Sequence, residues 1–279
     1  GLDIAATYGR PGCVDLLAEL VGDALTPDQL SIALRSVVRG NDERNLHNVA
    51  HMLAAAGFHR GSGQSIISLE DEMRCAIAAT LLRAGAVVNA VDERRRPALY
   101  WACRRGFENC TRLLLANGAQ VNARDDARRS CLFGATTKGV VNLLCDAKAD
   151  LTLEDSDGCF ILEKHCVTGQ SETILTLLKA RANVNQARGG EGGTALCMAA
   201  QNGFAASVSV LLKAKAMVNI VKADGTSALG LACMFGHMEV VELLLAAKAD
   251  AGGGMAVNGV KTLSALRCAC ERGHLEVVQ

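Results

Sequence analysis

The chain has 279 residues, more than most single compact cores hold, so we expect two domains or one elongated repeat array. Hydrophobic residues make up 50% of the chain but aromatic residues only 3%, a balance that suits closely stacked short helices, and three prolines favour helices over an all-β fold. Lys plus Arg and Asp plus Glu both number 29, so the net charge favours neither nucleic acid nor an anionic membrane as a partner.

Neither a membrane helix nor a signal peptide is visible in the sequence. No apolar run approaches the roughly 18–20 residues that a spanning helix needs. Gly1 and Gln279 both stand inside helical patterns, so we expect both natural ends to be missing. The lack of a targeting segment therefore says little about location.

Helix-turn-helix units are predicted along the whole chain, and the first 90 residues hold the irregular ones. Residues 1–24 resemble a truncated unit, and residues 25–90 hold two divergent units. The unit over 25–58 has extra residues between its helices. The unit over 59–90 keeps its second helix but loses most of its first, which Ser65–Glu70 replace.

Five recognisable units follow over residues 91–253, and a truncated one over 254–279. Each begins with a short predicted helix that ends at a glycine suited to a left-handed cap. These helices read PALYWACRRGF (97–107), SCLFGATTKG (130–139), FILEKHCVTGQ (160–170), TALCMAAQNGF (194–204), SALGLACMFGH (227–237) and SALRCACERGH (264–274). A second helix follows, as where Met238–Ala247 places apolar residues at helical spacing.

The ends of the second helices fix the period of the repeat. An alanine follows them at positions 86, 119, 149, 182, 216 and 249, with spacings of 33, 30, 33, 34 and 33. The short spacing falls in 124–153, where about one turn is lost and Gly139 runs directly into Val140. A register this regular indicates stacked repeats.

These features resemble the ankyrin repeat family, whose unit has 33 residues and a T-P-L-H-x-A signature. The match is best over Gly225–Val241 and covers residues 91–279 well. The Thr-Pro pair is nowhere intact, and the signature histidine is replaced at six positions: Tyr100, Phe133, Glu163, Cys197, Gly230 and Arg267. The resemblance implies an all-α ankyrin-repeat solenoid of stacked helix-turn-helix units with short extended loops.

The second helices of four later repeats end in a cation where the family has glycine. These residues are Lys148, Arg181, Lys215 and Lys248. A non-glycine residue costs about 1 kcal/mol if it must adopt the left-handed conformation. A cation beside a helix C-terminus recovers about 0.3–1 kcal/mol. We therefore expect a modestly stable stack.

The twelve cysteines are interpreted as packing residues. Cys103, Cys166, Cys233 and Cys270 share one slot between helices, and no C-x-x-C is present, so metal or disulfide roles are the weaker alternatives. Free buried thiols favour a reducing, intracellular and cytoplasmic location.

Other patterns give no chemistry. His47 and His51 lack the glutamate of the metalloprotease motif, and the glycine runs 189–193 and 252–254 lack a following Gly-Lys-Ser/Thr. We predict no catalytic residue, no cofactor and no metal, and therefore no enzyme.

The resemblance implies that a partner binds the concave face made by the loop tips and first helices. Carried onto this sequence, the partner-binding residues are Glu93, Arg94, Arg96, Trp101, Arg104, Arg105, Asp126, Arg129, Lys138, Lys164, Met198, Gln201, Asn202, Asp224, Leu231, Met234 and Phe235. A basic end around the only Trp is formed by Arg94–Arg96, Arg104, Arg105, Arg128 and Arg129, and an apolar end by Met198, Leu231, Met234 and Phe235. The alternative is a solvated arginine face with the apolar residues filling the groove between repeats.

The leading hypothesis is a protein-interaction scaffold that binds another protein with an acidic or mixed surface or peptide. A second is the targeting module of a larger enzyme, such as a kinase or ubiquitin ligase, whose catalytic domain lies outside the sequence. A third, nucleic-acid or lipid headgroup binding through the arginines, is disfavoured by the zero net charge and the few aromatics.

Overall fold

The computed structural model of the chain describes residues 28, 32, 35, 66–189, 192–251, 255–257 and 260–263. Its contacts divide the chain into two compact units, Gly1–Ala149 and Asp150–Gln279. The predicted repeats over 1–24 and 25–58, the histidines at 47 and 51, and the first helix predicted over 264–274 lie outside the described residues.

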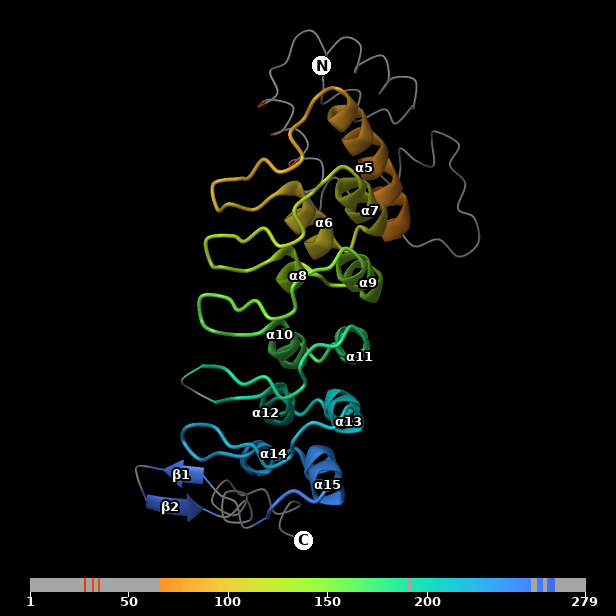
Figure 1. Ribbon diagram of the computed structural model, residues 1–279. Coiled ribbons are helices and arrows are strands. Elements are labelled where there is room, and N and C mark those ends of the chain that lie inside the picture. The colour runs from red at the N-terminus through yellow and green to blue at the C-terminus, as the bar shows by residue number, and fades with distance from the viewer. Residues whose placement is uncertain are drawn as a thin grey trace. The chain divides into compact units, whose positions relative to one another are not determined.

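In the first unit, short first helices alternate with longer second helices along the chain. The described helices are α5 (Ile66–Arg83), α6 (Ala98–Arg105), α7 (Glu108–Ala116), α8 (Cys131–Gly134) and α9 (Lys138–Asp146). Helix α6 packs on α8, while α5 packs on α7 and α7 on α9. Figure 1 shows the loops, the first helices and the second helices of this unit as three separate columns.

Helix α5 departs from the expected pattern. Residues 66–70, which were expected to replace a first helix, are instead the opening turns of α5, a single helix of 18 residues. No glycine or proline stands between Ile66 and Arg83 to interrupt it. The helix ends shortly before Gly85, whose φ of +97° is open to glycine alone at little cost.

The second unit repeats the same plan. Its described helices are α10 (Ile161–Val167), α11 (Ser171–Lys179), α12 (Ala195–Gln201), α13 (Ala205–Lys213), α14 (Ala228–Phe235) and α15 (Met238–Ala246). Helix α12 packs between α10 and α14, and α13 packs between α11 and α15. The longer segment after α15 forms an antiparallel hairpin of β1 (Met255–Val257) and β2 (Val260–Leu263). Apart from this hairpin, the expected all-α class of stacked repeats is confirmed in both units.

Each loop between repeats is a narrow hairpin closed by one antiparallel bridge. The bridges join Val91 to Pro97, Arg124 to Ser130, Glu154 to Phe160, Ala187 to Thr194 and Val221 to Ser227. In the first loop the carboxylate of Asp92 accepts hydrogen bonds from the backbone N–H groups of Arg94 and Arg96. An aspartate that binds its own turn in this way stiffens the loop, so the tips have defined positions.

The core consists of one apolar layer per repeat. Leu99, Leu114, Leu132 and Leu144 are fully buried in the first unit, and Leu177, Leu196, Leu211 and Leu229 in the second. The predicted packing role of the shared cysteine slot is confirmed for Cys103, Cys166 and Cys233, which are at most 3% exposed, while Cys270 lies outside the described residues. Burial raises the pKa of the Cys166 thiol and raises that of Cys131 to about 12, so both thiols stay protonated.

Both predicted kinds of helix end are confirmed. The first helices end at Gly106, Gly169, Gly203 and Gly236, with φ between +69° and +75°. The second helices end at Lys148, Arg181, Lys215 and Lys248, with φ between +61° and +68°. The prediction is wrong at Gly139, which lies inside α9 and does not end a first helix. The missing turn is confirmed, because α8 has only four residues.

Candidate protein-interaction surface

The loop tips of the first unit carry arginines in a strained backbone conformation. Arg95 and Arg128 each have φ of +59°, at the position where the second unit has Gly158, Gly192 and Gly225. A left-handed residue other than glycine costs about 1 kcal/mol. The two tips touch through a hydrogen bond of 3.2 Å from the backbone N–H of Asp126 to the carbonyl of Arg94. The first unit therefore presents two adjacent arginine-bearing tips.

Arg96 is held firmly by three side chains of its own repeat. Its Nε and Nη2 lie 3.0 and 2.9 Å from Oδ2 of Asp92. Its guanidinium lies 4.4 Å from the centre of the Trp101 ring and 5.9 Å from that of Tyr100, close enough for cation–π attraction. These bonds with Arg96, and those from the loop backbone, lower the pKa of Asp92 against the opposing effect of burial. Arg96 is thus a fixed part of the loop.

Arg129 occupies the corresponding position in the next loop. Its Nε and Nη2 lie 3.0 and 2.8 Å from Oδ2 of Asp125, a carboxylate that is almost fully buried. Arg124 donates from Nε to the carbonyl of Arg128 at 2.7 Å. Successive loops therefore use one arginine for internal support and expose others at the tip.

A groove with a volume of about 680 Å³ lies beside the first of these loops. Trp101 forms part of its wall, with Arg96 against the ring. It is lined by Ile32, Arg35, Val91, Asp92, Glu93, Arg94, Arg96 and Trp101. The structure thus brings four predicted residues together around one hollow: Glu93, Arg94, Arg96 and Trp101.

The basic character of this region extends to the first helix. Arg104 and Arg105 are both exposed at the C-terminal end of α6. Between residues 91 and 138 the chain has ten Lys and Arg but only five Asp and Glu, whereas residues 150–251 have eight and eleven. The overall neutrality therefore conceals a basic segment in the first unit.

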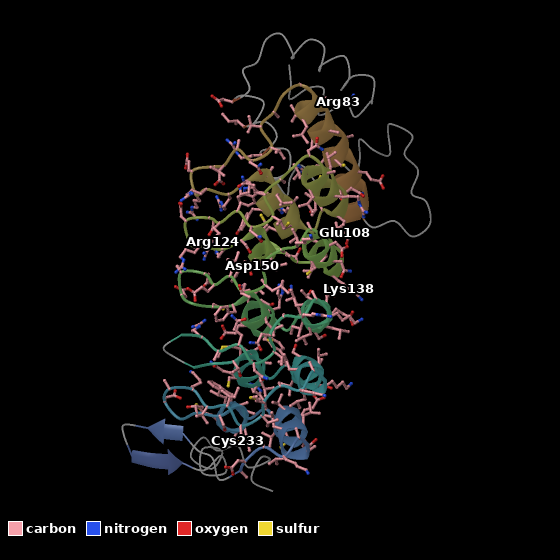
Figure 2. All side chains as sticks on the ribbon, in the orientation of Figure 1. Arg83, Glu108, Arg124, Lys138, Asp150 and Cys233 are labelled. Atoms are coloured by element: carbon pink, nitrogen blue, oxygen red, sulfur yellow. The ribbon has the colours of Figure 1, made fainter. Side chains whose placement is uncertain are left out.

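Lys138 does not lie where the repeat pattern predicts. It was expected just before a cap glycine, at the end of a first helix, but it is the first residue of the second helix α9. The loss of a turn from α8 shifts the register and carries Lys138 to the second-helix side, whereas Arg124 lies among the loops, as Figure 2 shows. Lys138 thus stands apart from the arginine tips.

In the second unit the predicted residues fall into an exposed set and a buried one. Lys164, Asn202, Asp224 and Phe235 are exposed, and Met198, Gln201 and Met234 are half-buried. Phe235 is 46% exposed and stacks on His237 with ring centres 6.3 Å apart. Leu231 is only 4% exposed, because its side chain packs inside the repeat, so the surface proposed below omits it.

A buried polar group in α10 lies apart from this surface. Glu163 is 1% exposed; its Oε2 accepts a hydrogen bond from the N–H of Phe160 and lies 3.9 Å from Nε of Arg188. Burial raises the pKa of this carboxyl. Nearby, the Nδ1 of buried His165 lies 2.6 Å from Oε1 of Gln170, and burial lowers the pKa of this imidazole. Both groups are internal to the repeat and cannot contact a partner directly.

Sequence reasoning missed four residues of the groove. Ile32 and Arg35 lie in the irregular part of the chain, where no repeat register assigns positions to a face. Val91 and Asp92 precede the turn in which the repeat pattern predicts partner-binding positions. The one available signal was the loop pattern Asp-x-x-x-Arg, shared by Asp92–Arg96 and Asp125–Arg129, which pairs opposite charges across a tight turn.

Comparisons with known proteins agree on the kind of repeat. A family model described as "Ankyrin repeats (3 copies)" matches residues 70–155, 162–254 and 218–279. The crystal structure of the human ASB11 ankyrin repeat domain is similar, with a TM-score of 0.66 and 25% identity over 77% of this chain and 98% of that one. No curated protein matches the chain.

Among the described residues, no helix is both long and apolar enough to cross a membrane.

Proposed function

Because the chain belongs to the ankyrin repeat family, whose repeats are in general protein–protein interaction modules and typically non-catalytic, we propose that it is an interaction scaffold without catalysis of its own. It binds a partner protein with an acidic or mixed surface or peptide along the face made by the loops and first helices. Its location is intracellular and cytoplasmic, which suits the seven buried thiols among the described cysteines.

The arginines on the loop tips and on the first helix α6 of the first unit are the observation that carries this proposal. Arg95 and Arg128 have a left-handed backbone conformation that is costly for arginine, and glycine stands at the corresponding positions of the second unit. Together with Arg94 on the first loop and Arg104 and Arg105 at the end of α6, they add to the excess of basic residues in this unit. Arginine is enriched at binding hot spots and pairs with carboxylates through two parallel hydrogen bonds. An acidic partner surface is the natural complement.

The face of the second unit supplies contacts of another kind. Met198 and Met234 are half-buried and Phe235 is exposed, and thioethers adapt well to an irregular apolar surface. Gln201 and Asn202 provide polar groups at the end of α12. An apolar region of a partner is therefore the complement of this face.

The experiment is affinity capture with the full chain as bait, followed by identification of the partners. Arg104→Glu with Arg105→Glu should abolish capture while the helical circular dichroism and the melting curve stay unchanged. The matched control is Arg83→Glu with Arg112→Glu, which makes the same charge change on the second helices α5 and α7. Capture should survive in the control, and capture retained by the first variant would refute the proposal.

A targeting module of a larger enzyme, such as a kinase or ubiquitin ligase, is the second candidate. The similar crystal structure is that of an ankyrin repeat domain, which shows this fold used as a part of a protein. Sequencing the full-length reading frame decides between the two, because a catalytic domain beside the repeats would make the capture face a substrate-recruiting surface.

A further inference from the structure

We propose that the groove beside Trp101 binds an acidic peptide segment of the partner in which an apolar side chain stands between carboxylates. This inference rests on the proposed function and adds to it the site and the chemistry of the bound segment. The groove volume of about 680 Å³ is within the range of about 300–1,000 Å³ that is typical of ligand pockets.

One wall of the groove is preorganised. Arg96 is bound through two nitrogens to Asp92 and lies on the Trp101 ring, and its side chain is only 13% exposed. A ligand therefore meets a fixed wall whose positive and negative charges largely cancel. Fixing these side chains before binding reduces the conformational entropy lost when the peptide docks.

The charges that can attract a ligand come from the two other arginines of the groove. Arg94 is exposed on the loop, and Arg35 is half-buried on the facing segment. Besides Asp92, which is paired with Arg96, the lining has one acidic residue, Glu93. Two guanidinium groups against one carboxylate leave a net positive site, and the neighbouring tip residue Arg95 adds to it. Carboxylate side chains on the peptide match this pattern.

The apolar part of the lining is the reason why we include an apolar side chain in the proposed peptide. Ile32 is 55% exposed and Val91 is 45% exposed, so both present aliphatic surface to the groove. Covering this surface removes it from water, which favours an aliphatic or aromatic side chain on the ligand. The acidic residues on either side of that side chain then lie near the arginines.

The same geometry disfavours a nucleic acid in the groove. Single-stranded nucleic acids bind through aromatic faces on which bases stack. The aromatic residue of the lining is Trp101, whose ring is 8% exposed and lies against Arg96, with the edge of Tyr100 also in contact. The site thus has the positive charge that a phosphate needs but no open face for a base.

The test uses the full chain and a fluorescein-labelled peptide with glutamates on both sides of one leucine, followed by fluorescence polarisation. Arg35→Glu and Arg94→Glu should each weaken binding about tenfold or more, because each removes a charge-assisted contact and adds a repulsion. Glu93→Arg should tighten binding severalfold. Arg112→Glu, which makes the same charge change on α7, should alter binding less than about threefold.

Two further probes check the chemistry of the ligand. A peptide with serine in place of the leucine should bind about tenfold more weakly, and single-stranded RNA should bind more weakly than the leucine peptide. Equal loss in Arg94→Glu and Arg112→Glu, equal binding of the serine peptide, or tighter binding of RNA would each overturn the inference.

Failure of the peptide-binding test can be distinguished from failure of the capture experiment. In one outcome, Arg94→Glu loses peptide binding but partner capture does not depend on Arg104 and Arg105. Recognition then takes place in the groove, and the proposed binding along the loops and first helices is refuted. Capture that depends on Arg104 and Arg105, with no peptide binding to the groove, refutes only the groove.

Discussion

The imidazole of His237 lies directly against Gly203 of the preceding repeat. A Cβ added to Gly203 would stand 2.6 Å from Nδ1 of His237, and Nε2 of the same ring lies 3.0 Å from the carbonyl oxygen of Gln201. The same arrangement joins Gly169 to Phe204, with 2.8 Å to the ring. The cap glycine therefore has two roles, since it ends its own helix and also receives a side chain of the next repeat.

Gly203→Ala should lower the free energy of unfolding by about 2–4 kcal/mol. The φ of +72° costs an alanine about 1 kcal/mol, and overlap with the imidazole adds about 1–3 kcal/mol. Urea unfolding followed by circular dichroism measures the loss. Gly118→Ala is the control, because Gly118 has φ of +81° but nothing within 4 Å of the added Cβ, so it should lose only about 1 kcal/mol. Equal losses would show that the contact with His237 does not matter.

Local backbone features could be predicted from the sequence, because the repeat register assigns each residue a place in its own turn. The left-handed conformations of Lys148, Arg181, Lys215 and Lys248 follow from their alignment with glycine alone. The predicted position of Lys138 was wrong because the repeat register is not kept there. A missing turn breaks the register, and the sequence does not show which helix loses it.

The residues of the groove could be predicted only in part. Arg94, Arg96 and Trp101 follow from the register, but the clamp of Arg96 by Asp92 depends on the conformation of the turn. Arg35 and Ile32 reach the groove from a part of the chain without a regular period. Contacts between segments that share no register are set by packing, which a single sequence does not reveal.

Replacing Lys215 should separate backbone strain from charge. Lys215 has φ of +64° at the end of α13, so Lys215→Ala keeps the strain and removes the cation, whereas Lys215→Gly removes both. The glycine variant should be about 1 kcal/mol more stable than the alanine variant, and urea midpoints at constant slope measure the difference. An alanine variant as stable as the glycine variant would show that the position carries no strain.

Asp71 in α5 caps the neighbouring helix α7. Its carboxylate, 4% exposed, accepts hydrogen bonds from the backbone N–H groups of Asn109 and Cys110, at 2.6 and 2.9 Å. Asp71→Ala leaves the buried N–H of Cys110 and the half-buried N–H of Asn109 without this acceptor and should cost about 1–3 kcal/mol. Asp71→Asn keeps an acceptor oxygen and should cost less. Thermal unfolding of the two variants tests the ordering, and an asparagine variant as unstable as the alanine variant would contradict the capping role.

Glu163 should make the stability of the chain depend on pH. Burial raises the pKa of its carboxyl above the ordinary value of 4.5, so the folded state disfavours the ionised form. The resulting loss of stability is fully present above the raised folded pKa. It disappears as the pH falls through that value toward 4.5. Oε1 has no hydrogen-bond partner among the described residues, which adds to the cost of ionisation.

Glu163→Gln should therefore be at least as stable as the parent chain at pH 7. Glutamine retains an oxygen that can accept the hydrogen bond from the N–H of Phe160 but carries no buried charge. Its advantage should shrink as the pH falls toward about 4.5, where the parent carboxyl becomes protonated. Burial lowers the pKa of His165, which also takes up a proton on acidification, but both proteins retain it, so the difference between their urea unfolding curves isolates Glu163. Glu163→Ala removes the acceptor of this hydrogen bond, so it should be about 1–3 kcal/mol less stable than the glutamine variant at every pH. A glutamine variant that is less stable than the parent at pH 7, by an amount that falls on acidification, would show instead that the ionised carboxylate stabilises the repeat through Arg188.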